Sequence, residues 1–248
     1  SLSNNDSGTG NTIFGKTAGD PDGAGDYNTF IGELSGGTGT QTDDADYNVG
    51  VGYYALAALT QGTKNTAIGV GSLEDVTIGD NNTAIGFQAL QDLGTAQSDD
   101  NVAIGYQAMS GAIGTEIVDD CVAIGSLSLA GDLDSTNGAD EASGTVAIGA
   151  QALGSLTSGH GSVAMGYGAL NSATTVDGNT GIGYYSGLYT TGANNTYLGY
   201  NAGKGASGAE AGNTAVGKDA MLAVTDGQAN TTVGLGSGAA LTTGDQNT

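Results

Sequence analysis

Hydrophobic and polar positions repeat along this chain in one short pattern. The segment "NNTAIGFQAL" (81–90) is followed by "DNVAIGYQAM" (100–109), and then by "DCVAIGSLSL" and "GTVAIGAQAL". Counted from the residue that is usually Asn, 13 complete copies begin between Asn11 and Asn230, with a basic spacing of seventeen residues lengthened by insertions. A period of this length is typical of solenoids, in which each repeat forms one structural unit.

Each column of the repeat has a consistent chemistry. The second position is Thr in 8 copies and Val in 5, the fourth is always large and apolar, and the fifth is always Gly. The eighth is Ala or Ser, and the ninth is Leu or Met in 8 copies and Gly in 5. β-Branched residues favour strands, and Gly permits a tight turn or a close approach to another backbone. The pattern predicts one short strand, a turn, a second short strand through Ala-Leu, and a closing turn.

Because side chains alternate along a strand, positions two and four lie on the same face, and we expect that face to form the core of each coil. The expected core residues are Ile68, Ile85, Ile104, Ile124, Ile148, Met165, Ile182 and Leu198. One coil cannot bury its own apolar face, whereas stacked coils can. The sequence therefore predicts an all-β fold, a parallel β-solenoid (β-roll) of about 13 coils.

The repeats also divide the chain. We expect 1–10 to be a lead-in or the end of a preceding coil, 11–246 to be the solenoid, and 247–248 to start a further repeat. Insertions are expected near 36–47, 91–100, 110–120 and 130–144. Ten of the 13 first positions are Asn, which predicts a ladder of amide hydrogen bonds from coil to coil.

The third position is Ala or Gly in most copies, although by alternation it would face away from the core. A column of small residues lets a second backbone approach closely, and so slim a coil buries little apolar surface. We therefore expect oligomeric packing through this column; the alternative is that Ala only fits a crowded pleat. The interface candidates are Ala67, Ala84, Ala103, Ala123, Ala147 and Ala164.

Charge restricts the partners. Four Lys+Arg against 26 Asp+Glu give a formal net charge of −22, which disfavours nucleic acid and anionic membranes. No apolar run is long enough to span a bilayer, so we expect no membrane insertion. The single Cys121 permits no intrachain disulfide and reads as an inert ladder substitute. His160 stands in a turn with no expected acidic partner, which argues against a metal ligand or general base.

Paired carboxylates suggest two kinds of chemistry, calcium binding and glycoside hydrolysis. We expect solvated acidic loops instead, with no catalytic residues and no cofactor. If calcium binds, the insertion 129–144 is the first place to look, and its candidate ligands are Asp132, Asp134, Asp140 and Glu141.

Tyrosines recur at the sixth position and gather between 184 and 200. Exposed aromatic rings bind receptors well, although packing between coils is the simpler interpretation. The receptor-contact candidates are Tyr184, Tyr185, Tyr189, Tyr197 and Tyr200. The Thr column invites an ice-binding interpretation, which the expected core-facing orientation of that column opposes.

The phrases "NTAIGFQAL", "NVAIGYQAM" and "SVAMGYGAL" resemble the head repeats of trimeric autotransporter adhesins. They are also similar to tandem repeats of phage tail fibres and large bacterial surface proteins. The resemblance covers essentially residues 11–248 and implies a left-handed β-roll with three chains around one axis. It implies an extracellular, homotrimeric fibre or adhesin segment that attaches multivalently to cell-surface glycans or proteins. The alternatives are a tailspike-like polysaccharide depolymerase, an ice-binding solenoid, or a spacer rod.

Overall fold

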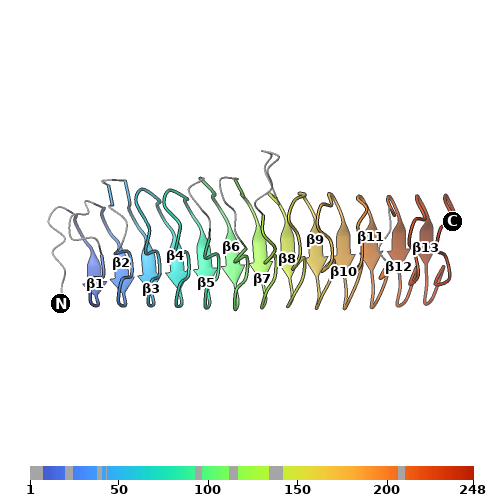
Figure 1. The fold of residues 1–248 in the computed structure, drawn as a ribbon, viewed down its shortest axis with the longest axis horizontal. Helices are drawn as coiled ribbons and strands as arrows, with labels where there is room; N and C mark the ends of the chain where they lie inside the picture. The colour runs from blue at the N-terminus through green and yellow to red at the C-terminus, as the bar shows by residue number, and fades with distance from the viewer. Residues whose placement is uncertain are drawn as a thin grey trace.

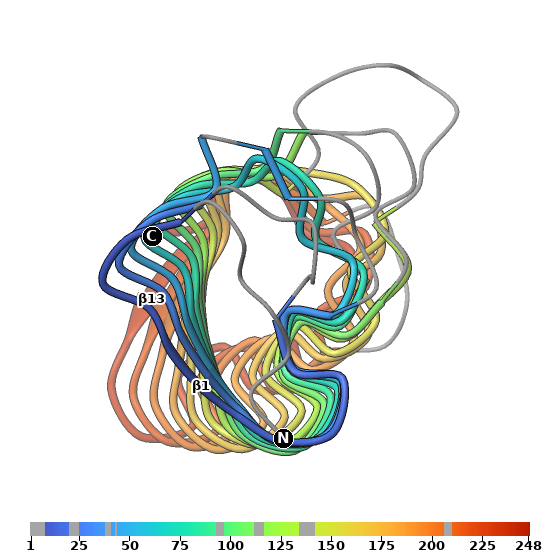
Figure 2. The ribbon, with the colours of Figure 1, turned by 90° about the vertical axis from the view of Figure 1, so that its left-hand side faces the viewer.

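The computed structural model shows a rod in which each repeat forms one coil (Figure 1). Thirteen strands, one from each copy, form a single parallel sheet in sequence order. Viewed along the rod, the coils lie one behind another with a steady offset, and β1 and β13 lie on the same side (Figure 2). The expected all-β solenoid is confirmed. The structure describes residues 8–19, 25–37, 41–42, 44–92, 97–111, 117–133, 142–205 and 210–248.

Every strand has three residues and occupies positions two to four of its repeat. The strands are β1 (Thr12–Phe14), β2 (Thr29–Ile31), β3 (Val49–Val51), β4 (Thr66–Ile68), β5 (Thr83–Ile85), β6 (Val102–Ile104), β7 (Val122–Ile124), β8 (Val146–Ile148), β9 (Val163–Met165), β10 (Thr180–Ile182), β11 (Thr196–Leu198), β12 (Thr214–Val216) and β13 (Thr231–Val233). Equivalent positions pair, as in Ala84 with Ala103. Insertions therefore do not shift the register.

The expected second strand through Ala-Leu is wrong for the described residues, which contain one strand per coil and no helix. Positions seven and nine have positive φ, for example 51° at Gln88 and 49° at Leu90, and such residues cannot continue a strand. Their backbone groups still bond from coil to coil. Leu90 N–H donates to the carbonyl of Ala108 at 2.9 Å.

The core faces the opposite side of the strands from the one expected. The third position is inside: all six proposed interface alanines (Ala67, Ala84, Ala103, Ala123, Ala147 and Ala164) are fully buried within the single chain. The fourth position faces out: Ile68, Ile85, Met165 and Leu198 are exposed, and Ile104, Ile124, Ile148 and Ile182 are half-buried. The core assignment of the isoleucine column and the interface assignment of the alanine column were both wrong.

The physical reason is the space that the ninth position fills. Where that residue is Leu or Met, as at Leu90, its side chain is buried in the coil and leaves room only for Ala or Gly at position three. Where it is Gly, position three is usually large. A Cβ added to Gly36 would lie 2.6 Å from Phe30 Cε1. The two positions share one core volume, so an isoleucine column would not fit inside.

The invariant Gly at position five is explained by a close approach between coils. At Gly86, φ is +139°, and an added Cβ would collide with the carbonyl of Gly105 in the next coil. Any side chain would separate the two coils. The expectation that this Gly lets two backbones pass closely is confirmed.

The predicted Asn ladder is also present. Asn82 N–H donates to Oδ1 of Asn65 at 2.9 Å, and Asn101 N–H donates to Oδ1 of Asn82 at 3.0 Å. Each ladder side chain also donates from Nδ2 to a turn carbonyl, as Asn65 does to Gly79 at 2.7 Å. From Asn28 to Asn230 these Asn side chains are buried, whereas Asn11 in the first coil is half-buried. Burying amides is favourable only because both ends are bonded.

Candidate interaction surfaces

The outward face of the sheet consists of positions two and four of every coil. In all 13 copies these positions are Thr, Val, Ile, Leu, Met or Phe, and none is charged. The fourth position is 37% exposed at Ile85 and 45% at Leu198. Contiguous exposed apolar surface of this kind marks an interaction site in soluble proteins. Sequence reasoning missed this face because it placed it in the core.

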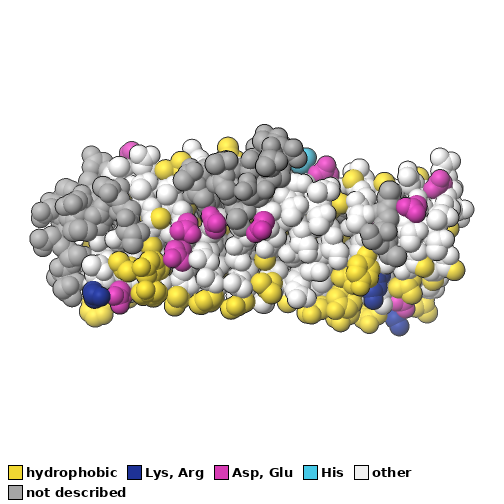
Figure 3. All heavy atoms as spheres, in the orientation of Figure 1, with side chains coloured by type: hydrophobic (Ala, Val, Ile, Leu, Met, Phe, Trp, Pro, Cys, Tyr) yellow, Lys and Arg dark blue, Asp and Glu magenta, His cyan; other side chains and the backbone are white. Residues whose placement is uncertain are grey.

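A second surface follows the sixth position, where the chain leaves each strand. Hydrophobic side chains gather along one long edge of the face shown in Figure 3. Tyr167 and Tyr184 stack at 5.5 Å between ring centroids, and Tyr184 and Tyr200 at 5.2 Å. Their planes are within 15° of parallel, so Tyr184 has an aromatic neighbour on each side.

The structure separates the five receptor-contact candidates. Tyr184, Tyr189 and Tyr200 are exposed, and Tyr185 is half-buried. Tyr197 is fully buried, because it occupies the core-facing third position, where Gly203 leaves room for its ring. Its assignment as a receptor contact was wrong.

Two lysines lie over tyrosine rings in the C-terminal part of the row, near Tyr184 and Tyr200. Lys204 Nζ lies 5.3 Å from the ring centroid of Tyr185, and Lys218 Nζ lies 5.6 Å from that of Tyr200. An ammonium group within about 6 Å of a ring centroid is attracted by the negative face of the ring. Two of the four cations of this acidic chain therefore bind its own aromatic row.

The aromatic row is interrupted in the fourth coil, where positions six and seven are Val70 and Gly71. A pocket of about 380 Å³ lies at this interruption. Its lining comes from three successive coils: Tyr53, Tyr54, Val70, Glu74, Phe87 and Gln88, together with Gly71.

Glu74 supplies the charge of this pocket. Its Oε2 accepts a hydrogen bond from Gln91 Nε2 at 3.0 Å. Burial raises the pKa of Glu74, the nearby charge of Asp75 raises it further, and the bond from Gln91 opposes both effects. No ion pair among the described residues includes Glu74.

Many of the aspartates form a second ladder, two residues before the Asn ladder. Asp80 N–H donates to Oδ1 of Asp99 at 2.7 Å, and Asp99 N–H donates to Oδ1 of Asp119 at 2.7 Å. These carboxylates are acceptors for the backbone of the preceding coil. The pairs that suggested metal or acid–base chemistry are explained in part by this role.

The described residues contain no group of three or more His, Cys, Asp or Glu side chains placed to hold a metal. They therefore do not support the calcium hypothesis. Asp132 is exposed. The other three candidates, Asp134, Asp140 and Glu141, lie outside the described residues.

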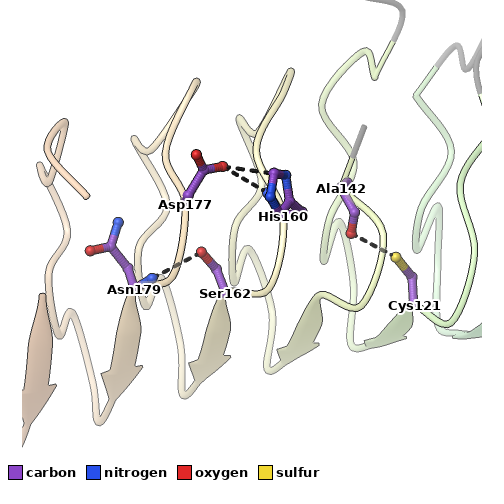
Figure 4. Close-up of polar contacts among 6 residues, drawn as sticks. All are labelled: Cys121, Ala142, His160, Ser162, Asp177 and Asn179. Atoms are coloured by element: carbon purple, nitrogen blue, oxygen red, sulfur yellow. Dashed lines mark hydrogen bonds and ion pairs between the residues drawn. The ribbon is translucent and has the colours of Figure 1, made fainter. Parts of the chain in front are cut away.

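Cys121 and His160 both belong to the ladders (Figure 4). Cys121 N–H donates to Asn101 Oδ1 at 3.0 Å, and its Sγ donates to the carbonyl of Ala142 at 2.9 Å, in place of an Asn amide. Burial raises the pKa of the thiol to about 12, so the thiolate is scarce at neutral pH. His160 does have an acidic partner, contrary to expectation: its ring Nδ1 lies 3.5 Å from Asp177 Oδ1, and its backbone N–H donates to the same oxygen at 3.0 Å.

A buried polar cluster lies between the tenth and eleventh coils. The hydroxyl oxygens of Tyr197 and Thr190 and Oε2 of Glu210 are buried, with no hydrogen-bond partner among the described residues. Burial raises the pKa of Glu210 to about 7. The remaining oxygen, Oε1, accepts from Thr191 N–H at 3.2 Å.

No protein-family model matches this chain, and no curated protein sequence matches it either. In the described parts of the chain, no helix has the length and hydrophobicity needed to cross a bilayer.

Proposed function

We propose that this chain is a structural and adhesive segment, a homotrimeric β-solenoid of a phage tail fibre or of a cell-surface adhesin. It would act outside the cell and attach to glycan or protein receptors at several equivalent points, without enzymatic activity. The observation that carries the proposal is the uncharged outward face of the sheet.

That face suits a second copy of the same chain. It runs from β1 to β13 without a charged side chain, whereas the chain as a whole carries a formal charge of −22. Copies that meet through this face bury its isoleucine, leucine and valine side chains and keep their acidic turns in water. That the oligomer contains three chains is inferred from the resemblance to trimeric adhesin heads.

Receptor contact would then be made by the aromatic row at position six, which follows the outward face in the coils that carry Tyr or Phe there. Tyr184 and Tyr200 are exposed in this row, half-buried Tyr185 adjoins it, and exposed Tyr189 lies in the turn that follows in the same coil. Repetition in several copies would give avidity to contacts that are individually weak.

The oligomeric state tests the proposal directly. Light scattering after size-exclusion chromatography should give three times the mass of 24.0 kDa, and association should strengthen with salt because salt screens like charges. Replacing Ile85 and Ile104 by Lys should yield monomers that keep the β-rich circular dichroism spectrum. Ser126→Lys is the matched control, since Lys16 and Lys218 occupy the same position in other copies. A monomeric wild-type chain would contradict the proposal.

Ice binding is a second candidate because the Thr column faces outward rather than into the core. Thr at position two and a large apolar residue at position four lie on the same outward face, which repeats at the strand spacing, about 4.8 Å. Four successive coils carry Val instead, at Val102, Val122, Val146 and Val163, which favours apolar packing in the middle of the rod. Thermal hysteresis measurements distinguish ice binding from association through this face. Ice binding predicts hysteresis for the Ser126→Lys control and its loss in the variant with Lys at Ile85 and Ile104, whereas association alone predicts no hysteresis in either.

A further inference from the structure

The pocket at the fourth coil combines aromatic rings with one carboxylate. Tyr53 and Phe87 flank Val70 at position six, and Tyr54 and Gln88 flank Gly71 at position seven. Phe87 already stacks on Tyr106 of the next coil at 5.5 Å. Its other side faces the fourth coil, where Val70 interrupts the aromatic row.

The pocket exists because Gly71 has no side chain. In the ninth coil, Gly168 occupies the same position, but a Cβ added there would lie 2.6 Å from Tyr185 Cδ1, so a tyrosine ring covers that glycine. Over Gly71 the corresponding neighbour is Gln88, whose Cγ would be 3.4 Å from an added Cβ, and Oε2 of Glu74 would be at 2.9 Å. The Tyr185 ring covers Gly168 of the ninth coil, whereas the Glu74 carboxylate lies beside Gly71 of the fourth coil.

Other coils show which group suits such rings in this chain. Tyr185 and Tyr200 each have a lysine ammonium over the ring. In the fourth coil the rings are accompanied by Glu74, which has no ion-pair partner among the described residues. A carboxylate beside aromatic faces attracts an organic cation more strongly than a neutral molecule.

We propose that the pocket lined by Tyr53, Glu74 and Phe87 binds an organic ammonium group carried on a small ligand, such as a quaternary amine or an amino sugar. The rings supply cation–π attraction, and Glu74 supplies the countercharge. The pocket lies at positions six and seven of the repeat, outside the sheet face that is proposed to join the copies. Ligand binding and the oligomeric state therefore test the two proposals separately.

An NMR titration of the whole chain with choline tests the proposal. We expect saturable shifts of the Gly71 and Gln88 amides at low salt. The neutral isostere 3,3-dimethylbutan-1-ol should give none. Glucosamine against N-acetylglucosamine repeats the comparison for amino sugars and identifies which source of the ammonium group the site prefers.

Two variants locate the site. Glu74→Gln keeps the shape but removes the charge, and should weaken binding about tenfold or more, which corresponds to about 1.4 kcal/mol. Gly71→Gln fills the space with a residue that three other copies carry at this position, and should abolish the shifts. Asp75→Asn is the control for loss of one nearby charge and should change affinity by no more than about threefold.

Three results would overturn the inference. One is equal binding of the neutral isostere, the second is unchanged affinity in Glu74→Gln, and the third is the absence of saturable shifts with both choline and glucosamine. The isostere comparison uses only the unmodified chain, so it stands even if a variant fails to fold.

Discussion

The shared core volume of Phe30 and Gly36 predicts strong coupling between the two positions. Phe30→Ala removes a buried ring, which should lower the free energy of unfolding by about 3–5 kcal/mol. Gly36→Leu adds a side chain whose Cβ alone would lie 2.6 Å from the Phe30 ring. Overpacking costs about 1–3 kcal/mol, and Leu at a φ of +59° costs about 1–2 kcal/mol more.

The double variant should be far more stable than these losses suggest. It recreates the pair formed by Ala84 and Leu90, in which Leu is accommodated at a φ of 49°. Only the cost of the positive φ remains, about 1–2 kcal/mol. Independent effects would sum to about 5–10 kcal/mol, so the cycle should give a coupling energy of about −4 to −8 kcal/mol.

Hydrogen exchange is the appropriate assay, because in a solenoid each coil contacts only its neighbours and unfolding is not all-or-none. The Gly32 amide, bonded to the carbonyl of Phe14 at 2.8 Å, should exchange faster in each single variant and recover in the double. The Gly166 amide, bonded to Ile148 at 2.7 Å in the ninth coil, should not change. Additive losses in the double variant would refute the shared-volume explanation.

Three further predictions concern charge and the ladders. Glu210 should hold its proton to about pH 7 in the folded chain but lose it near its ordinary pKa in the unfolded chain, so stability should fall by up to about 3 kcal/mol as pH rises between the two values. Thermal melts recorded across this pH range should show the fall for the wild type and for the control Asp44→Asn, but not for Glu210→Gln. Parallel pH profiles for Glu210→Gln and the wild type would contradict the assignment. Asn65→Ala leaves a buried N–H and a buried carbonyl unbonded and should lower the opening free energy of the fourth coil, measured by hydrogen exchange, by about 2–4 kcal/mol. Asn65→Ser should cost less, and equal losses would count against the ladder. Ala84→Lys should abolish the protection of fifth-coil amides from hydrogen exchange, whereas Ile85→Lys should preserve it. Greater loss of protection in Ile85→Lys than in Ala84→Lys would indicate that the isoleucine column, not the alanine column, lies in the core.

The sequence was sufficient to predict the coil, the strand at positions two to four and the Asn ladder, because each depends on a column that repeats in nearly every copy; the second strand that it predicted is absent from the described residues. It did not reveal which face of the strand is inside. In a three-residue strand such as Thr83–Ile85 both faces carry apolar residues, so alternation alone cannot choose between them. The deciding signal was present in a second column: Gly36 and Gly203 accompany Phe30 and Tyr197, and Leu accompanies Ala.

The surfaces were predicted less well, for related reasons. Tyr197 was grouped with its neighbours in sequence, whereas its place in the third column puts it in the core. The aspartates were considered as adjacent pairs, although Asp80, Asp99 and Asp119 each stand two residues before the ladder position. The pocket at Gly71 depends on side chains from three coils, and no single repeat contains that information.

The Asn ladder gives the rod a direction. After the first coil, each Asn of the ladder donates its backbone N–H to the side chain of the coil before it, as Asn82 does to Asn65 and Asn101 to Asn82. This column therefore leaves a backbone N–H free at one end of the rod and a side-chain oxygen at the other, and the Asp ladder runs in the opposite sense, since Asp80 N–H donates to Asp99 in the following coil. Two rods could continue one another head to tail with both ladders extended, while head-to-head contact would oppose like groups, so end-to-end association of such rods would be polar.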